Sequence, residues 1–191
     1  MTASIQSLVK YFKRQDLTGN EITHATGKPP VIFSDLKKYS SLEQLLGKEG
    51  YVVILLQVNS ANSGHWVAIT KDDNTGKFRW CDPYGIPWMV EIRDYVPFDH
   101  TNFPNYIKEL FSQNNRQTEY NTVDYQAKQP GISTCGRYAT LFTKLRNISL
   151  KQIDLLFKTN SVSYLQDSDN LVTLLTLLMM GNIPEYFEKQ K

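Results

Sequence analysis

The sequence contains few cysteines and few histidines. Two cysteines, Cys81 and Cys135, are too few for a disulfide scaffold in a chain of 191 residues, so we expect a reducing compartment. The three histidines form no cluster with the spacing of a metal site, and neither a phosphate loop nor a dinucleotide fingerprint is present. We therefore expect an activity that needs no metal and no cofactor.

Long apolar runs and an excess of one charge are also absent. The longest apolar stretches, "YVVILL" and "LLTLLMM", are far shorter than the roughly 20 residues of a membrane-spanning helix. The first residues, "MTASIQSLVKYFKRQ", lack the continuous apolar run of a signal peptide. The 21 basic and 19 acidic residues nearly balance, so no strongly charged partner is demanded. These absences predict an intracellular protein without a membrane partner, and in that setting a lone thiol can be a nucleophile.

The order of the hydrophobic patterns predicts helices at both ends of the chain and strands in the middle. Apolar residues recur at helical spacing near the N-terminus and again after Cys135, while runs of β-branched residues lie between. We predict helices at 4–14, 41–47, 104–113, 135–146, 150–159 and 169–180, and strands at 51–58, 65–70, 77–82 and 118–127. Residues 18–30 are predicted to be mostly loop with room for one helical turn.

This layout predicts an α+β fold with a central mixed β-sheet flanked by helices. We expect one domain over residues 1–191. Its parts would be a helical N-terminal region at 1–48, a core at 50–145 that carries the chemistry, and C-terminal helices at 146–191.

Two polar residues stand at the ends of neighbouring predicted strands. His65 opens one strand directly after "NSG", and Asp82 closes the next strand just before "PYG". If these strands pair as a hairpin around "DDNTG", the start of the first lies beside the end of the second. A carboxylate beside an imidazole fixes its tautomer and stabilises the imidazolium. The hairpin would therefore supply a base together with its orienting partner.

Cys135 lies where the turn-rich stretch "QPGIST" gives way to a predicted helix. At a helix N-terminus, free backbone N–H groups and the helix dipole favour the thiolate, and a nearby His65 cation would stabilise it further. Such a thiolate is the nucleophile of a cysteine hydrolase. Gln129, six residues earlier, could cradle an oxyanion together with the backbone N–H of Cys135. Gly131 and Gly136 would let the backbone come close to a substrate.

Each of these residues also has an ordinary structural interpretation. A free cysteine is most often a small buried hydrophobic residue, and we assign that role to Cys81, which lies on a predicted strand face. His65 could be a hydrogen-bonded residue at a strand end, Asp82 a turn residue, and Gln129 part of a loop. Only their joint arrangement points to a Cys/His/Asp hydrolase, and the structural interpretation stays open beside it.

Three motifs occur in a fixed order along the chain: "GHWVAI", "WCDPYG" and "QPGISTCG". This order resembles that of the adenain and SUMO-protease superfamily of cysteine peptidases, which has His-Trp, an acidic residue at a strand end, Gln, and then Cys-Gly. The Gln-to-Cys interval is similar to the SUMO-protease form. In contrast, "FRWCDPYGIP" and "STCGRYATLF" look most like the viral branch, the capsid-maturation proteases of adenoviruses, virophages and Polinton-type elements.

Two positions depart from parts of this superfamily. Adenain has Glu where this chain has Asp82, whereas the SUMO proteases have Asp at this position. Thr134 stands where SUMO proteases often have Asp before the cysteine, which favours the viral branch. The resemblance covers residues 50–145, and the first 48 residues carry no recognised motif.

The resemblance implies an adenain-like fold with the catalytic cysteine at the N-terminus of a helix. It also implies roles for the matching residues: Cys135 as nucleophile, His65 as base, Asp82 as third member and Gln129 as oxyanion donor. Trp66 would cover a narrow groove that admits small residues before the scissile bond, beside Gly136.

From the resemblance we expect a cysteine endopeptidase that cleaves viral capsid precursor proteins at Gly-containing sites. It would act as a monomer in the virion or in the cytoplasm of an infected host cell. Three alternatives stay open: an isopeptidase for ubiquitin-like modifiers, an acetyltransferase that uses the same Cys and His, and a capsid- or DNA-associated binding module with a vestigial site.

Adenain-type proteases can use DNA or a peptide as cofactor, and the resemblance extends that expectation to this chain. Basic residues that could form a patch for such a cofactor occur in two parts of the sequence, although we favour solvated helix faces. They are Lys10, Lys13, Arg14, Lys144, Arg146, Lys151 and Lys158.

Overall fold

The computed structural model describes residues 5–60, 63–89, 104–112, 118–159 and 167–181. A five-stranded sheet runs through it in the order β1-β2-β3-β4-β5. The strands are β1 (Val31–Ile32), β2 (Tyr51–Ser60), β3 (Ser63–Lys71), β4 (Phe78–Cys81) and β5 (Thr118–Tyr120). The two edge pairs, β1 with β2 and β4 with β5, are parallel, and the central pairs are antiparallel. The predicted α+β class with a mixed sheet is confirmed.

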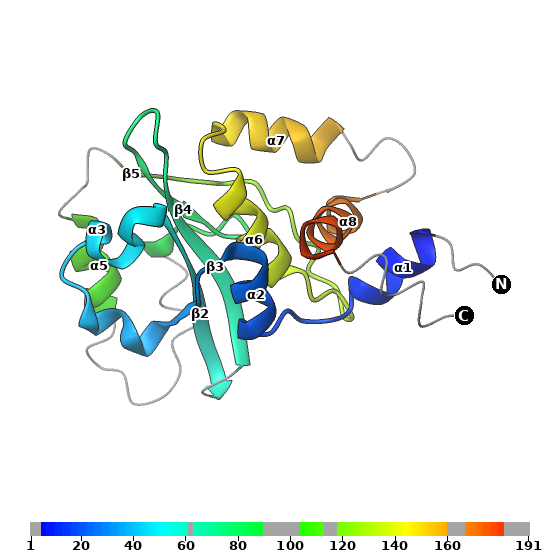
Figure 1. The fold of residues 1–191 in the computed structure, drawn as a ribbon, viewed down its shortest axis with the longest axis horizontal. Helices are drawn as coiled ribbons and strands as arrows, with labels where there is room; N and C mark the ends of the chain where they lie inside the picture. The colour runs from blue at the N-terminus through cyan, green and yellow to red at the C-terminus, as the bar shows by residue number, and fades with distance from the viewer. Residues whose placement is uncertain (1–4, 61–62, 90–103, 113–117, 160–166, 182–191) are drawn as a thin grey trace.

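Helices cover both faces of the sheet (Figure 1). One layer consists of α1 (Ile5–Phe12), α2 (Gly19–Thr26), α6 (Cys135–Lys144), α7 (Leu150–Thr159) and α8 (Ser168–Met180). The other contains the short helices η1 (Phe33–Lys38), α3 (Leu42–Leu46) and η2 (Gly47–Glu49), together with α5 (Pro104–Ser112). Within the described ranges, no helix has both the length and the apolar character needed to cross a bilayer.

The nearly continuous apolar run of β2 follows from its place inside this sandwich. Val53 and Leu55 point into the core beneath α6, whereas Ile54 and Leu56 point into the opposite core beneath α3 and α5. A strand buried on both faces needs apolar residues at every position instead of an alternating pattern. The same division applies to β3, where α6 packs directly against the strand.

Two sequence-based predictions of local structure are wrong. Residues 18–30 are predicted to be mostly loop with room for one helical turn, yet the eight-residue helix α2 forms there: Thr18 caps it in a reciprocal capping box with Glu21, and Gly27 ends it with φ 87°. The sequence pattern Thr-x-x-Glu was available as a start signal. The expected strand at 118–127 covers only Thr118–Tyr120, because the backbone N–H groups of Tyr125 and Gln126 leave the ladder and donate to Pro83 O.

Candidate active site

The β3–β4 hairpin brings His65 and Asp82 together, as the strand ends predicted. The register pairs Ala68 with Cys81, so Asp82 lies just beyond the last pair, close to the beginning of β3. His65 Nε2 donates to Asp82 Oδ1 at 2.6 Å, and the two side chains are 5% and 0% exposed. This short contact, shielded from water, is the geometry of a base with its orienting carboxylate.

Asp82 is held by four further hydrogen bonds, one of them from Gly85 N to Asp82 O at 2.9 Å. Its Oδ2 accepts from Ile86 N at 2.7 Å, its backbone N–H donates to Asn121 Oδ1 at 2.8 Å, and Asn121 Nδ2 donates back to Asp82 O at 2.6 Å. Asn121 directly follows β5 and is 2% exposed. The sequence analysis did not identify Asn121, because it lies inside the strand predicted at 118–127 and belongs to none of the three motifs.

Cys135 is the first residue of α6, as predicted, and its side chain forms a hydrogen bond with His65. Because Nε2 of the imidazole faces Asp82, Nδ1 is the ring nitrogen left for the sulfur. Within the described part of the chain, the backbone N–H groups of Cys135 and Gly136 donate no hydrogen bond. Asp82, His65 and Cys135 are therefore hydrogen-bonded in series, and the thiol at the end of the series belongs to a residue whose own backbone N–H donates to no described residue.

The charge state of His65 reflects these two contacts. Burial lowers the pKa of His65, but the hydrogen bonds with Asp82 and then Cys135 outweigh it and raise the pKa from 6.5 to about 10. At neutral pH the ring is therefore an imidazolium placed between a carboxylate and the sulfur. Such a cation stabilises a thiolate beside it.

We expect an NMR titration of the His65 ring to show a midpoint near pH 10. Since the folded-state pKa lies above 6.5, protonation of His65 stabilises the fold fully below about pH 6.5, and this contribution is lost as pH rises toward 10. In Asp82→Asn the midpoint should fall, because the strongest contact that raises it is removed. A wild-type midpoint at or below 6.5 would contradict this geometry.

Comparison with known proteins finds a similar viral sequence and similar solved structures. No family model matches the chain. Protein V9 of Sputnik virophage, which is described as uncharacterized, is 25% identical over 176 residues, covering 88% of this chain and 98% of V9. The central domain of the uncharacterized Lpg1148 protein from Legionella pneumophila is similar in structure, with a TM-score of 0.47, 14% identity, and coverage of 90% of this chain and 99% of that domain. The similarity to V9 indicates a viral or infected-cell context.

Tyr84 is a further neighbour of the candidate triad that the sequence analysis missed. Its ring stacks on the His65 ring, with centroids 4.8 Å apart and planes 16° from parallel. Lys128 lies over the Tyr84 ring at 5.2 Å and forms an ion pair with Asp124 at 2.9 Å. The aromatic face limits the rotation of the imidazole, so Tyr84 helps to keep both ring nitrogens aimed at their partners.

Gln129 lies in the turn that precedes α6 and is exposed to solvent. Ile132 N donates to Gln129 O at 3.2 Å, and Gly131 has φ 80°, a value that requires glycine in this tight turn. The role of Gln129 as oxyanion donor stays a prediction. Gln126, three residues earlier, is 3% exposed, and its Oε1 has no hydrogen-bond partner. The sequence analysis overlooked this second glutamine because it matched no motif.

Gly136 is in close contact with two side chains. A Cβ at this position would lie 3.0 Å from Leu17 Cβ and 3.1 Å from Trp66 Cδ1. The glycine thus allows Leu17, from the connection between α1 and α2, and Trp66, from β3, to pack on the first turn of α6. The substrate-binding roles of Gly136 and Trp66 stay predictions. Trp66 is 8% exposed, so little of its indole reaches the surface.

Cys81 has the structural role predicted for it. It lies in β4, is 2% exposed and belongs to the core beneath α6. Burial raises the pKa of the Cys81 thiol to about 12, so it stays protonated at neutral pH. Cys135 is also buried, at 8% exposed, and belongs to the same core, so the two thiols differ by the contact of Cys135 with His65 and by its place at the start of α6.

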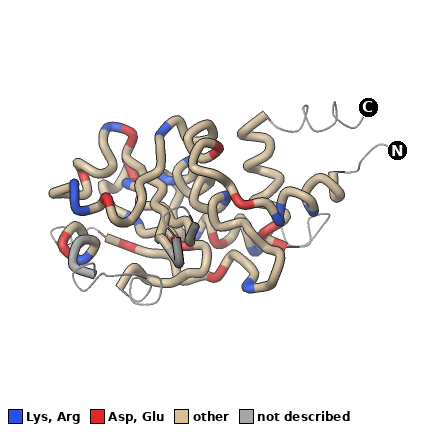
Figure 2. The backbone as a smooth tube through the Cα atoms, turned by 90° about the horizontal axis from the view of Figure 1, so that it is seen from below, with Lys and Arg blue, Asp and Glu red and all other residues tan. Residues whose placement is uncertain are grey.

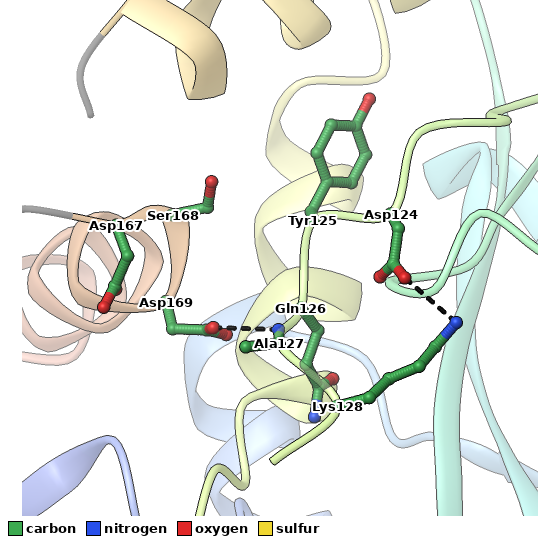
Figure 3. A pocket seen from close by; sticks show the side chains of 8 residues that line it. All are labelled: Asp124, Tyr125, Gln126, Ala127, Lys128, Asp167, Ser168 and Asp169. Atoms are coloured by element: carbon green, nitrogen blue, oxygen red, sulfur yellow. Dashed lines mark hydrogen bonds and ion pairs between the residues drawn. The ribbon is translucent and has the colours of Figure 1, made fainter. Parts of the chain in front are cut away.

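An open pocket of about 480 Å³ has none of the three candidate triad residues in its lining (Figure 3). The pocket is lined by residues 124–128 and by the start of α8. Each of the three carboxylates in its lining has a partner within the protein: Asp124 pairs with Lys128, Asp167 pairs with Lys13, and Asp169 accepts a hydrogen bond from Ala127 N. Neither these carboxylates nor any other group of three His, Cys, Asp or Glu side chains in the described residues is arranged to hold a metal ion.

Charged residues of both signs are interspersed along the described chain (Figure 2). Of the basic residues considered for a DNA or peptide cofactor, three are engaged within the molecule. Lys13 pairs with Asp167, Arg146 pairs with Asp73, and Lys144 donates to Thr26 O. The solvated-face interpretation of the remaining residues stays a prediction.

Proposed function

We propose that this chain is a cysteine endopeptidase in which Cys135 is the nucleophile, His65 the general base and acid, and Asp82 the orienting carboxylate. One observation carries the proposal: the buried 2.6 Å contact between His65 and Asp82 belongs to the same histidine that is hydrogen-bonded to Cys135. A nucleophile bonded to a base that a third group orients is the arrangement used in nucleophilic catalysis.

The first half of the reaction forms a thioester. The Cys135 thiolate attacks the peptide carbonyl, a C–S bond forms, and the carbonyl oxygen becomes an oxyanion. The free N–H of Cys135, with Gln129 as a further donor, would receive that charge. The His65 imidazolium then protonates the leaving amine, the C–N bond breaks, and the acyl group stays on the sulfur.

The second half restores the enzyme. Neutral His65 takes a proton from water as the hydroxide attacks the thioester carbonyl, and a second oxyanion forms at the same amides. When the C–S bond breaks, the new carboxyl product leaves and the imidazolium–thiolate pair returns. Throughout, Asp82 holds the ring by its 2.6 Å bond to Nε2, so Nδ1 stays directed at the reacting atoms.

We propose viral capsid precursor proteins as substrates. The 25% identity to a virophage protein over 88% of this chain supports a viral setting. Trp66 and Leu17 close in on the first turn of α6, beside the thiol. In the family that the motifs resemble, the Trp at this position covers a narrow groove before the scissile bond, and on that ground we propose cleavage next to glycine.

The test is to incubate the purified protein with virophage capsid precursors and with a peptide library, and to map the new termini by mass spectrometry. We expect cuts at Gly-containing sites, with glycine at the residue before the cut or just upstream. The Cys135→Ala protein should leave all substrates intact. Cleavage that persists in Cys135→Ala, or a preference for bulky residues, Arg or Lys before the cut, would refute the proposal, and turnover of acetyl-CoA without cleavage would indicate a transferase instead.

A further inference from the structure

The residue before the nucleophile is held by a carboxylate from a distant helix. Thr134 is the N-cap residue of α6, yet its side chain caps no backbone N–H. Instead, Thr134 Oγ1 donates to Asp169 Oδ1, although the two residues are 35 positions apart. Asp169 lies in the first turn of α8 and is 2% exposed.

The other oxygen of the same carboxylate holds the beginning of the nucleophile loop, defined here as residues 127–134. Asp169 Oδ2 accepts from the backbone N–H of Ala127 at 3.0 Å (Figure 3). One carboxylate thus joins both ends of the loop that contains Gln129 and leads into Cys135. A loop fixed at its two ends has little freedom to move its middle relative to the helix.

The Asp169 contact also affects the start of α6. A threonine at an N-cap normally accepts a hydrogen bond from a first-turn amide of the helix. Because the Thr134 hydroxyl is turned toward Asp169, it makes no such bond, and the N–H groups of Cys135 and Gly136 donate to no described residue. These are the amides that the proposed reaction needs for the oxyanion and for the thiolate.

We propose that Asp169 is a positioning residue of the active site, which holds the nucleophile loop at Ala127 and Thr134 and keeps the start of α6 uncapped. This inference rests on the proposed function and assigns Asp169 no contact with substrate. The carboxylate suits the task because it has two acceptor oxygens for two donors. An asparagine has one acceptor oxygen, so it can accept from only one of the two donors, and the Thr134 hydroxyl would have to reverse and accept from the amide NH2.

The chain offers matched variants for a test. Asp169→Asn removes one acceptor oxygen and the negative charge with little change in shape, and Thr134→Val removes the hydroxyl, and with it any bond to residue 169, while keeping the volume. Thr134→Ser keeps the hydroxyl and loses only a methyl group. Asp154→Asn is the control, because Asp154 accepts a hydrogen bond from Tyr125 Oη and has no bond to the nucleophile loop.

Three measurements apply to each variant: the alkylation rate of Cys135 by iodoacetamide across pH, followed by mass spectrometry; kcat and KM on the best glycine-containing peptide; and a melting curve. We expect Asp169→Asn and Thr134→Val to lower both the alkylation rate and kcat by about tenfold to a hundredfold, with KM changing less. Thr134→Ser and Asp154→Asn should react within about twofold of wild type.

Several results would overturn the proposal. Wild-type alkylation and kcat in folded Thr134→Val, which cannot bond to Asp169, would do so whatever Asp169→Asn shows. A loss in Thr134→Ser as large as in Thr134→Val would assign the effect to methyl packing, and an equal loss in Asp154→Asn would assign it to general destabilisation. Alkylation needs no substrate, so these outcomes stay distinct from a failure of the wild-type protein to cleave peptides.

Discussion

Iodoacetamide at near-neutral pH will alkylate Cys135 before Cys81 and will thereby stop proteolysis. Cys135 stands at the start of α6 beside the His65 imidazolium, two features that favour the reactive thiolate. Cys81 is buried in β4, and burial raises its pKa to about 12. Peptide mapping after brief labelling will show which thiol is modified, and Cys135→Ala should lower kcat/KM by about 10³-fold or more.

The matched control for this result is Cys81→Ala. That variant loses a buried thiol from the core beneath α6, so we expect a lower melting temperature with Cys135 still labelled and proteolysis retained. Preferential labelling of Cys81 with activity intact, or equal loss of turnover in the two cysteine variants at a temperature where both are folded, would contradict the assignment of the nucleophile.

Replacing His65 will have a comparably large effect, because the ring supplies both the proton transfers and the positive charge beside the sulfur. His65→Ala should lower kcat/KM by about 10³-fold or more. Asp82→Asn should cost less but still about 10²–10⁴-fold. An amide has one acceptor oxygen, so it cannot accept from both His65 Nε2 and Ile86 N, as the carboxylate does. Steady-state kinetics on peptides will measure both losses.

Asp72→Asn provides the control for the charge change. Asp72 is also a buried carboxylate, 3% exposed, but it lies at the opposite end of the β3–β4 hairpin and pairs with Arg79 at 2.5 Å. This variant should lose stability and keep kcat/KM, since none of its contacts reaches the triad. Wild-type turnover in Asp82→Asn would show that the carboxylate does not orient His65 during the reaction.

Local signals predicted most elements and the core of the site. The spacing of apolar residues identified β2, β3, β4, α6, α7 and α8, and the antiparallel hairpin placed His65 beside Asp82 from chain order alone. The miss at α2 had a different origin. Its capping box at Thr18 and Glu21 was readable, but its short apolar face of Ile22 and Ala25 gave too weak a period to outweigh the turn residues around it.

The surroundings of the triad could not be predicted, because they come from contacts between residues far apart in the chain. Asn121 is 39 positions from Asp82, and Asp169 is 35 positions from Thr134. No spacing rule links such residues, since their distance depends on how the edge strand and α8 pack against the sheet. The stacking of Tyr84 on His65 depends on the course of the chain after Asp82, which a motif does not specify.

By itself, the sequence determined the α+β class, the hairpin that pairs His65 with Asp82, and the place of Cys135 at the start of a helix, because these follow from side-chain periodicity, turn residues and chain order. Only the tertiary structure decided that Cys135 reaches His65, that Leu17 and Trp66 pack on Gly136, and that Asp169 holds Thr134. The physical reason is that packing of α6 and α8 against the sheet sets these contacts. Such packing depends on the volumes and shapes of many buried side chains at once.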